Sequence, residues 1–129
     1  MRRILVGAAA SEGSAAVLVA AAQLATTYGA ELIVLDVEPV VDARHVFDPE
    51  GAPDGPSGVA QIARRFPGLQ VRGQRIRGNP VRRVCEIASQ EKADIIVLPH
   101  GRRRGGGLSM KASSAVVEMA PCPVMLIAS

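Results

Sequence analysis

The apolar positions of the chain fall into short runs, and the segments between the runs have helical spacing. The runs at 4–6, 31–37, 94–98 and 123–128 are typical of buried parallel strands, and 69–76 alternates weakly, as an outer strand would. Helices are predicted between them, up to about 28, over 58–66, from 80 onward and over 109–119. Strands that alternate with helices predict a three-layer, doubly wound α/β domain with a mostly parallel sheet and helices on both faces.

Local residues set the expected ends and faces of these helices. Gly29 should stop one helix, the pair 67–68 should close the next, and the pair 79–80 should start the third. The helix that ends near 28 is expected to bury an apolar face that includes Tyr28. In the helix from residue 80, the spacing i, i+3, i+4, i+7 predicts one buried face and one solvent face; the buried set is Val81, Val84, Cys85 and Ala88, and the solvent set is Arg82, Arg83 and Glu86.

Composition narrows the class of protein. The 129 residues are read as one domain, 1–129, with 48% apolar content and three aromatic residues, so the core must be aliphatic. The longest apolar run falls short of a membrane span, and residues 1–10 resemble a buried strand more than an export signal, so we expect a cytoplasmic protein with no membrane partner. Cys85 and Cys122 are expected to be core thiols, and the Cys and His spacing matches no metal site.

Charge is unevenly distributed along the chain. Residues 31–54 hold seven acidic and one basic residue, whereas residues 64–104 hold eleven basic and three acidic residues. A basic half can attract nucleotides, nucleic acid or acidic proteins, or can simply be a solvated surface. Few aromatic residues accompany the arginines, which argues against nucleic acid as a partner.

A glycine- and arginine-rich loop follows the apolar run that ends at Leu98. Strand, glycine-rich loop and helix form an anion site in many α/β proteins, because backbone N–H groups and the helix N-terminus face the loop. The candidate anion-binding residues are Gly101, Arg102, Gly105, Gly106, Gly107, Ser109, Lys111 and Ser113. The alternatives are an exposed basic loop, and capping of the following helix by Ser109.

No arrangement of residues predicts catalysis. His100 would need a hydrogen-bonded partner and a nucleophile to act as a general base, and the sequence offers neither. There is no nucleophile elbow and no intact phosphate-binding lysine motif. We therefore expect a protein that is not an enzyme, with slow ATP hydrolysis left open.

Six segments together resemble the universal stress protein family along the whole chain. They read RRILV, SEGS, ELIVLDVEP, RGNPVRRV, ADIIVLPHGR and APCPVMLI, in that order. The resemblance implies a five-stranded parallel sheet in the order 3-2-1-4-5, as in adenine nucleotide alpha-hydrolase-like folds, and frequent homodimers. It also implies ATP binding in many members.

The ATP motif of that family is altered in this chain. Leu98 stands at the position of the first glycine, Gly101 keeps the second, and Met110 or Lys111 stands at the last. Ala9 replaces an aspartate, and Val37 would act through its backbone. Each lost partner typically costs about 1–3 kcal/mol of binding. The resemblance leaves three alternatives: a stress-response protein that acts through protein contacts with weak or absent ATP binding and no firm cofactor, an ATP- or AMP-binding regulator, or a protein that binds another anion.

The apolar strand at the end of the chain predicts self-association. If 124–128 forms the last strand of the sheet, its outer edge is apolar and unpaired, and soluble proteins rarely leave such edges open. Pairing with the same strand of a second copy would cover it. We therefore expect a homodimer through Val124–Ala128.

Overall fold

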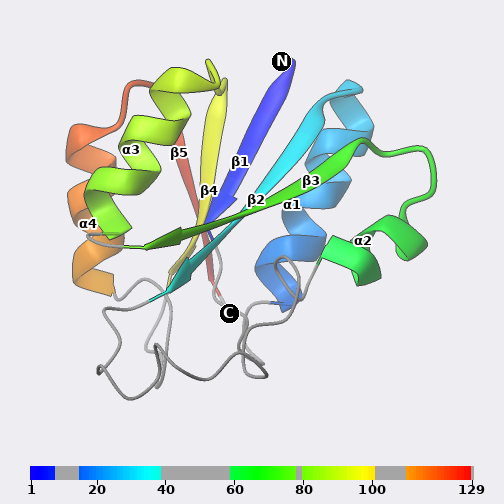
Figure 1. The fold of residues 1–129 in the computed structure, drawn as a ribbon, viewed down its shortest axis with the longest axis horizontal. Helices are drawn as coiled ribbons and strands as arrows, with labels where there is room; N and C mark the ends of the chain where they lie inside the picture. Colours follow the sequence, from blue (N-terminus) through cyan, green and yellow to red (C-terminus); the bar gives the residue numbers. More distant parts are fainter. Residues whose placement is uncertain (8–14, 39–58, 78–79, 101–109, 129) are drawn as a thin grey trace.

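The computed structural model describes all residues except 8–14, 39–58, 78–79, 101–109 and 129. In the described part, nine elements alternate along the chain (Figure 1). The strands are β1 (Arg3–Gly7), β2 (Glu31–Glu38), β3 (Val71–Arg77), β4 (Ile95–His100) and β5 (Val124–Ala128). The helices are α1 (Ala15–Tyr28), α2 (Val59–Arg65), α3 (Pro80–Gln90) and α4 (Met110–Met119).

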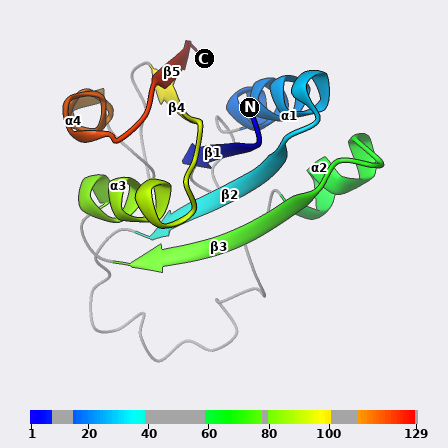
Figure 2. The same cartoon turned by 90° about the horizontal axis from the view of Figure 1, so that it is seen from above.

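The strands form one parallel sheet in the order β3-β2-β1-β4-β5, which confirms the predicted fold class. Helices α1 and α2 lie on one face and α3 and α4 on the other (Figure 2). Each face has its own aliphatic core. Alternation along β1 divides the two cores, because Ile4 and Val6 pack toward α1 whereas Leu5 packs toward α3.

Several predicted boundaries shift by one or two residues, for identifiable reasons. β4 continues past Leu98 because Pro99 and His100 still pair with β5. Pro99 is tolerated in this inner strand because the last pair between β1 and β4, Val6 with Val97, lies before it, so no ladder bond needs its missing N–H. The helix predicted from 109 is described from Met110.

The predicted helix faces are confirmed in part. Val84 and Ala88 are buried as expected, and so is Ile87, which the spacing argument did not include. The expectation for Tyr28 was wrong, since its side chain is 57% exposed. Tyr28 is the last residue of α1, beyond the residues that pack against the sheet. Cys85 is a free, half-buried thiol, and so is Cys122.

Helices α1 and α3 end in the same hydrogen-bond motif. After α1, the N–H of Ala30 donates to the carbonyl of Ala25 (2.8 Å) and Gly29, with φ +64°, takes the left-handed position. After α3, Ala93 donates to Ala88 (2.9 Å), and the left-handed position is held by Lys92, with φ 54°. These are Schellman caps, which glycine usually closes. The predicted stop at Gly29 is therefore confirmed.

The α2–β3 connection is a tight turn at the predicted pair 67–68. The N–H of Leu69 donates to the carbonyl of Phe66 (3.1 Å), and Gly68 has φ +96°. Proline followed by a glycine of positive φ is the preferred sequence of a type II turn. This bond keeps Leu69 in the turn, so β3 begins at Val71 and not at 69 as predicted.

Four charged side chains join the amino ends of the strands to the end of α3. Arg72 bonds the carboxylates of Glu31 (3.2 Å) and Glu91, and Arg3 donates to the backbone carbonyl of Glu91 (2.7 Å). The hydrogen bond from Arg72 lowers the pKa of the Glu91 carboxyl. The network lies where the strands begin, at the opposite end of the sheet from the predicted anion site.

Candidate functional site

The carboxyl ends of the parallel strands lie together at one end of the sheet. β1 ends at Gly7, opposite Leu35 of β2, and β2 continues for three more residues to Glu38. On the other side β4 runs on to His100. The strand order also reverses at β1, since β2 and β4 flank it. In open α/β sheets, ligands bind beyond the carboxyl ends of strands at such a switch point.

A buried serine fixes the start of α4 to the end of β4. Ser113, in the first turn of α4, is 1% exposed and its hydroxyl donates to the carbonyl of Pro99 (3.2 Å). This bond holds the N-terminus of α4, the positive end of the helix dipole, beside the carboxyl end of β4. Ser113 was predicted as an anion ligand. In this structure its hydroxyl group donates its proton to the backbone carbonyl of Pro99.

The structure brings the predicted site together only in part. Val37 lies in β2, beyond the last residue paired with β1, and Lys111 is the second residue of α4. The remaining predicted residues lie outside the described residues: Ala9, Gly101, Arg102, Gly105, Gly106, Gly107 and Ser109. Their flanking elements converge, because Gly7 and His100 end adjacent strands and Met110 begins the helix fixed to β4.

The structure shows where two positions of the expected ATP motif lie. Leu98 is 0% exposed and packs in the core between the sheet and α3 and α4, where it stands for the motif's first glycine. Met110, one of two candidates for the last glycine, is the first residue of α4. A residue with a side chain at a helix start restricts how close an anion can come to the backbone.

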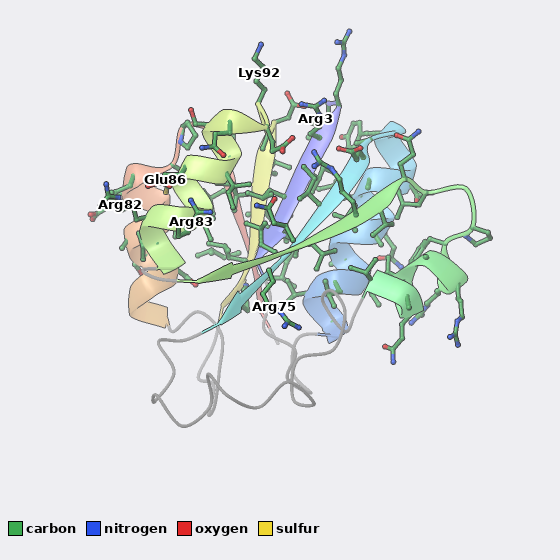
Figure 3. All side chains as sticks on the ribbon, viewed as in Figure 1. Arg3, Arg75, Arg82, Arg83, Glu86 and Lys92 are labelled. Carbon is green, nitrogen blue, oxygen red and sulfur yellow. The ribbon has the colours of Figure 1, made fainter. Side chains whose placement is uncertain are left out.

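Arg75 is a further basic residue near this end of the sheet that sequence reasoning did not select. It lies on β3 in register with Asp36 of β2, on the α1 side of the sheet, and it is half-buried (Figure 3). The alternation of β3 was too weak to predict which face Arg75 occupies. The face on which Arg75 lies is fixed by the pairing of β3 with β2, and a single sequence does not reveal this pairing.

Ionisable groups elsewhere in the described chain do not form a reaction centre. Burial raises the pKa of the Cys85 thiol, and burial followed by the charge of Asp94 raises that of Cys122, so both thiols remain protonated near neutral pH. On α3, the hydrogen bond from Arg83 lowers the pKa of Glu86, which also pairs with Arg82 (Figure 3). Within the described residues, no three His, Cys, Asp or Glu side chains are placed to hold a metal ion.

The outer strand β5 presents apolar side chains to solvent. Met125 and Leu126 are each 37% exposed, and they point to opposite faces of the sheet. In the described part of the chain β5 pairs only with β4, so its other edge has no strand beside it. Among the described helices, none is both long and apolar enough to cross a membrane.

A family model and several solved structures similar to this chain all point to the same protein family. The model of the universal stress protein family matches residues 1–128. Similar solved structures include the universal stress protein UspA from Lactobacillus plantarum, with 24% identity, a TM-score of 0.71 and coverage of 98% of this chain and 97% of that one.

Two further similar structures carry nucleotides. One is a universal stress protein in complex with cAMP, with 21% identity, a TM-score of 0.71 and coverage of 98% and 96%. The other is the Archaeoglobus fulgidus protein in complex with dAMP, with 18% identity, a TM-score of 0.68 and coverage of 98% and 97%. A search of curated protein sequences found no significant match. The family match over nearly the whole chain shows that this protein belongs to the universal stress protein family.

Proposed function

We propose that this chain is a cytoplasmic stress-response protein that forms homodimers and acts mainly through protein contacts, with weak or absent ATP binding. The observation that carries the proposal is the apolar outer edge of β5, where Met125 and Leu126 remain exposed. Pairing β5 with a second copy across a two-fold axis would satisfy its edge and bury both side chains. No catalytic role is included in the proposal.

The altered ATP motif supports the second half of the proposal. A leucine at position 98 fills the core instead of leaving the backbone accessible, and the start of α4 carries a methionine. Ala9 supplies no carboxylate for the hydroxyl groups of an adenosine. Two such losses would weaken binding by roughly one to four orders of magnitude, at about 1–3 kcal/mol each.

Sedimentation and calorimetry test the two halves separately. Sedimentation equilibrium at micromolar concentration should give twice the chain mass of 13.4 kDa, and Met125→Lys should shift the mass toward the monomer. Tyr28→Lys is the matched control, since it replaces another exposed apolar side chain away from β5 and should leave the dimer intact. A wild-type monomer would refute the dimer.

A second function, ATP or AMP binding, is favoured by the arrangement at the carboxyl end of β1. Its position at the switch point and the helix N-terminus fixed by Ser113 suit an anion. Two proteins of similar fold hold cAMP and dAMP. The arginines of the following loop would then replace the missing backbone contacts.

Isothermal titration with ATP and with AMP, with and without magnesium, decides between the two functions. The first proposal expects no heat of binding at micromolar nucleotide, and the second expects micromolar affinity that falls in Arg102→Gln. Mass analysis of nucleotide carried through purification is an independent readout. Copurified ATP would reject the first proposal.

A further inference from the structure

A groove lies at the end of the sheet where the strands begin. Its volume is about 570 Å³; residues 25–30 at the end of α1 form one wall, and residues 65–70, which join α2 to β3, form the other. The volume is in the range of sites that accept a small molecule or one or two side chains.

The lining of the groove is mixed, with only slightly more apolar than polar surface. Phe66 and Leu69 are half-buried, and Pro67 lies between Phe66 and Gly68 in the tight turn. Thr26 and Gln70 contribute polar groups, and the hydroxyl of Thr26 is already bonded to the carbonyl of Ala22 (2.8 Å). An apolar side chain would therefore find hydrophobic contact in the groove.

The rim of the groove is positively charged. Arg65 lines the groove, Arg64 precedes it in α2 and is exposed to solvent, and among the described residues neither has an ion-pair partner. Glu31 lies next to the groove residue Ala30, but Arg3 and Arg72 already share its carboxylate. The rim thus has cations whose charge no nearby described carboxylate neutralises.

We infer that this groove docks an acidic segment of a partner protein that carries an apolar anchor side chain. The anchor would fill the space beside Phe66, and flanking carboxylates would pair with Arg64 and Arg65. A partly apolar lining with an adjacent arginine pair matches that chemistry, whereas an anion without an apolar group would leave the groove empty. The inference refines the protein-contact role proposed above, and it uses a surface separate from both β5 and the carboxyl ends of the strands.

The test is a titration of the ¹⁵N-labelled full chain with three peptides, followed by NMR. The first peptide has a central Leu-Phe flanked by two glutamates on each side. The second replaces the glutamates by glutamines, and the third replaces Leu-Phe by serines. The first peptide should shift the amide signals of residues 25–30 and 65–70 at submillimolar concentration, and each control peptide should bind at least several-fold more weakly.

Paired variants locate the charges. Arg64→Gln with Arg65→Gln should weaken the first peptide about three- to tenfold, as expected for two exposed ion pairs. Arg82→Gln with Arg83→Gln removes the same charge from two adjacent arginines on α3 and should change affinity less than twofold. The amide spectrum of each variant also reports whether it is folded.

Any of the following results would overturn the inference: no shifts in either wall of the groove, equal binding of the glutamine peptide, or equal loss in both arginine pairs. Equal binding of the serine peptide would likewise show that charge alone acts. A failure here would leave the proposed function standing if the sedimentation test still gives a dimer and calorimetry still finds no nucleotide binding. Copurified nucleotide, in contrast, would defeat the proposed function without affecting the groove.

Discussion

Lys92 takes a backbone conformation at the end of α3 that glycine takes at the end of α1, so replacing it by glycine should relieve backbone strain. Both caps have the same bond from the residue after the left-handed position, Ala30 to Ala25 and Ala93 to Ala88. Lys92 has φ 54°, and a left-handed residue with a Cβ costs about 1–2 kcal/mol.

Part of that gain is lost again. Glycine gives the unfolded chain more freedom, which offsets about 0.4–1 kcal/mol, and the lysine charge after a helix C-terminus contributes about 0.3–1 kcal/mol. Lys92→Ala removes the charge but keeps the strain, so it is the proper reference. We expect Lys92→Gly to exceed Lys92→Ala in unfolding free energy by about 1 kcal/mol.

The reverse change at Gly29 supplies the matched test. No atom lies within 4 Å of a Cβ built at Gly29, so Gly29→Ala introduces backbone strain without a clash. It should lower the unfolding free energy by about 1 kcal/mol, after the same entropy offset. Urea unfolding measures the change in unfolding free energy for both variants, provided that the dependence of this free energy on urea concentration is unchanged. If Lys92→Gly is no more stable than Lys92→Ala, the strain argument is wrong.

Two further changes test other bonds. Glu91→Gln should cost about 0.5 kcal/mol at pH 7, a small value because its partner Arg72 is 45% exposed. Since the pKa of Glu91 is lowered in the folded state, its contribution is present above the ordinary carboxyl pKa of about 4.3 and is lost as the pH falls through the lowered value. Wild type and variant should therefore converge in acid-range urea titrations, and a constant gap would contradict this account. Ser113→Ala should cost about 1 kcal/mol in the same assay, because it removes the buried bond to Pro99, whereas the exposed neighbour Ser114→Ala should cost almost nothing.

The sequence by itself determined the alternation of strands and helices, the helix stop at Gly29 and the turn at 67–68. These features follow from backbone preferences and side-chain periodicity within a few residues, so they can be read locally. It also predicted that a strand precedes the glycine- and arginine-rich segment, which β4 confirms.

Only the tertiary structure decided which distant residues meet. The pairing of β3 with β2 placed Arg75 on the α1 side of the sheet, and the end of α3 placed Glu91 beside Arg72. The fold also left Tyr28 in solvent, although its spacing fitted the buried face of α1. Strand register and the contacts between elements depend on residues that are tens of positions apart, and no local preference specifies them.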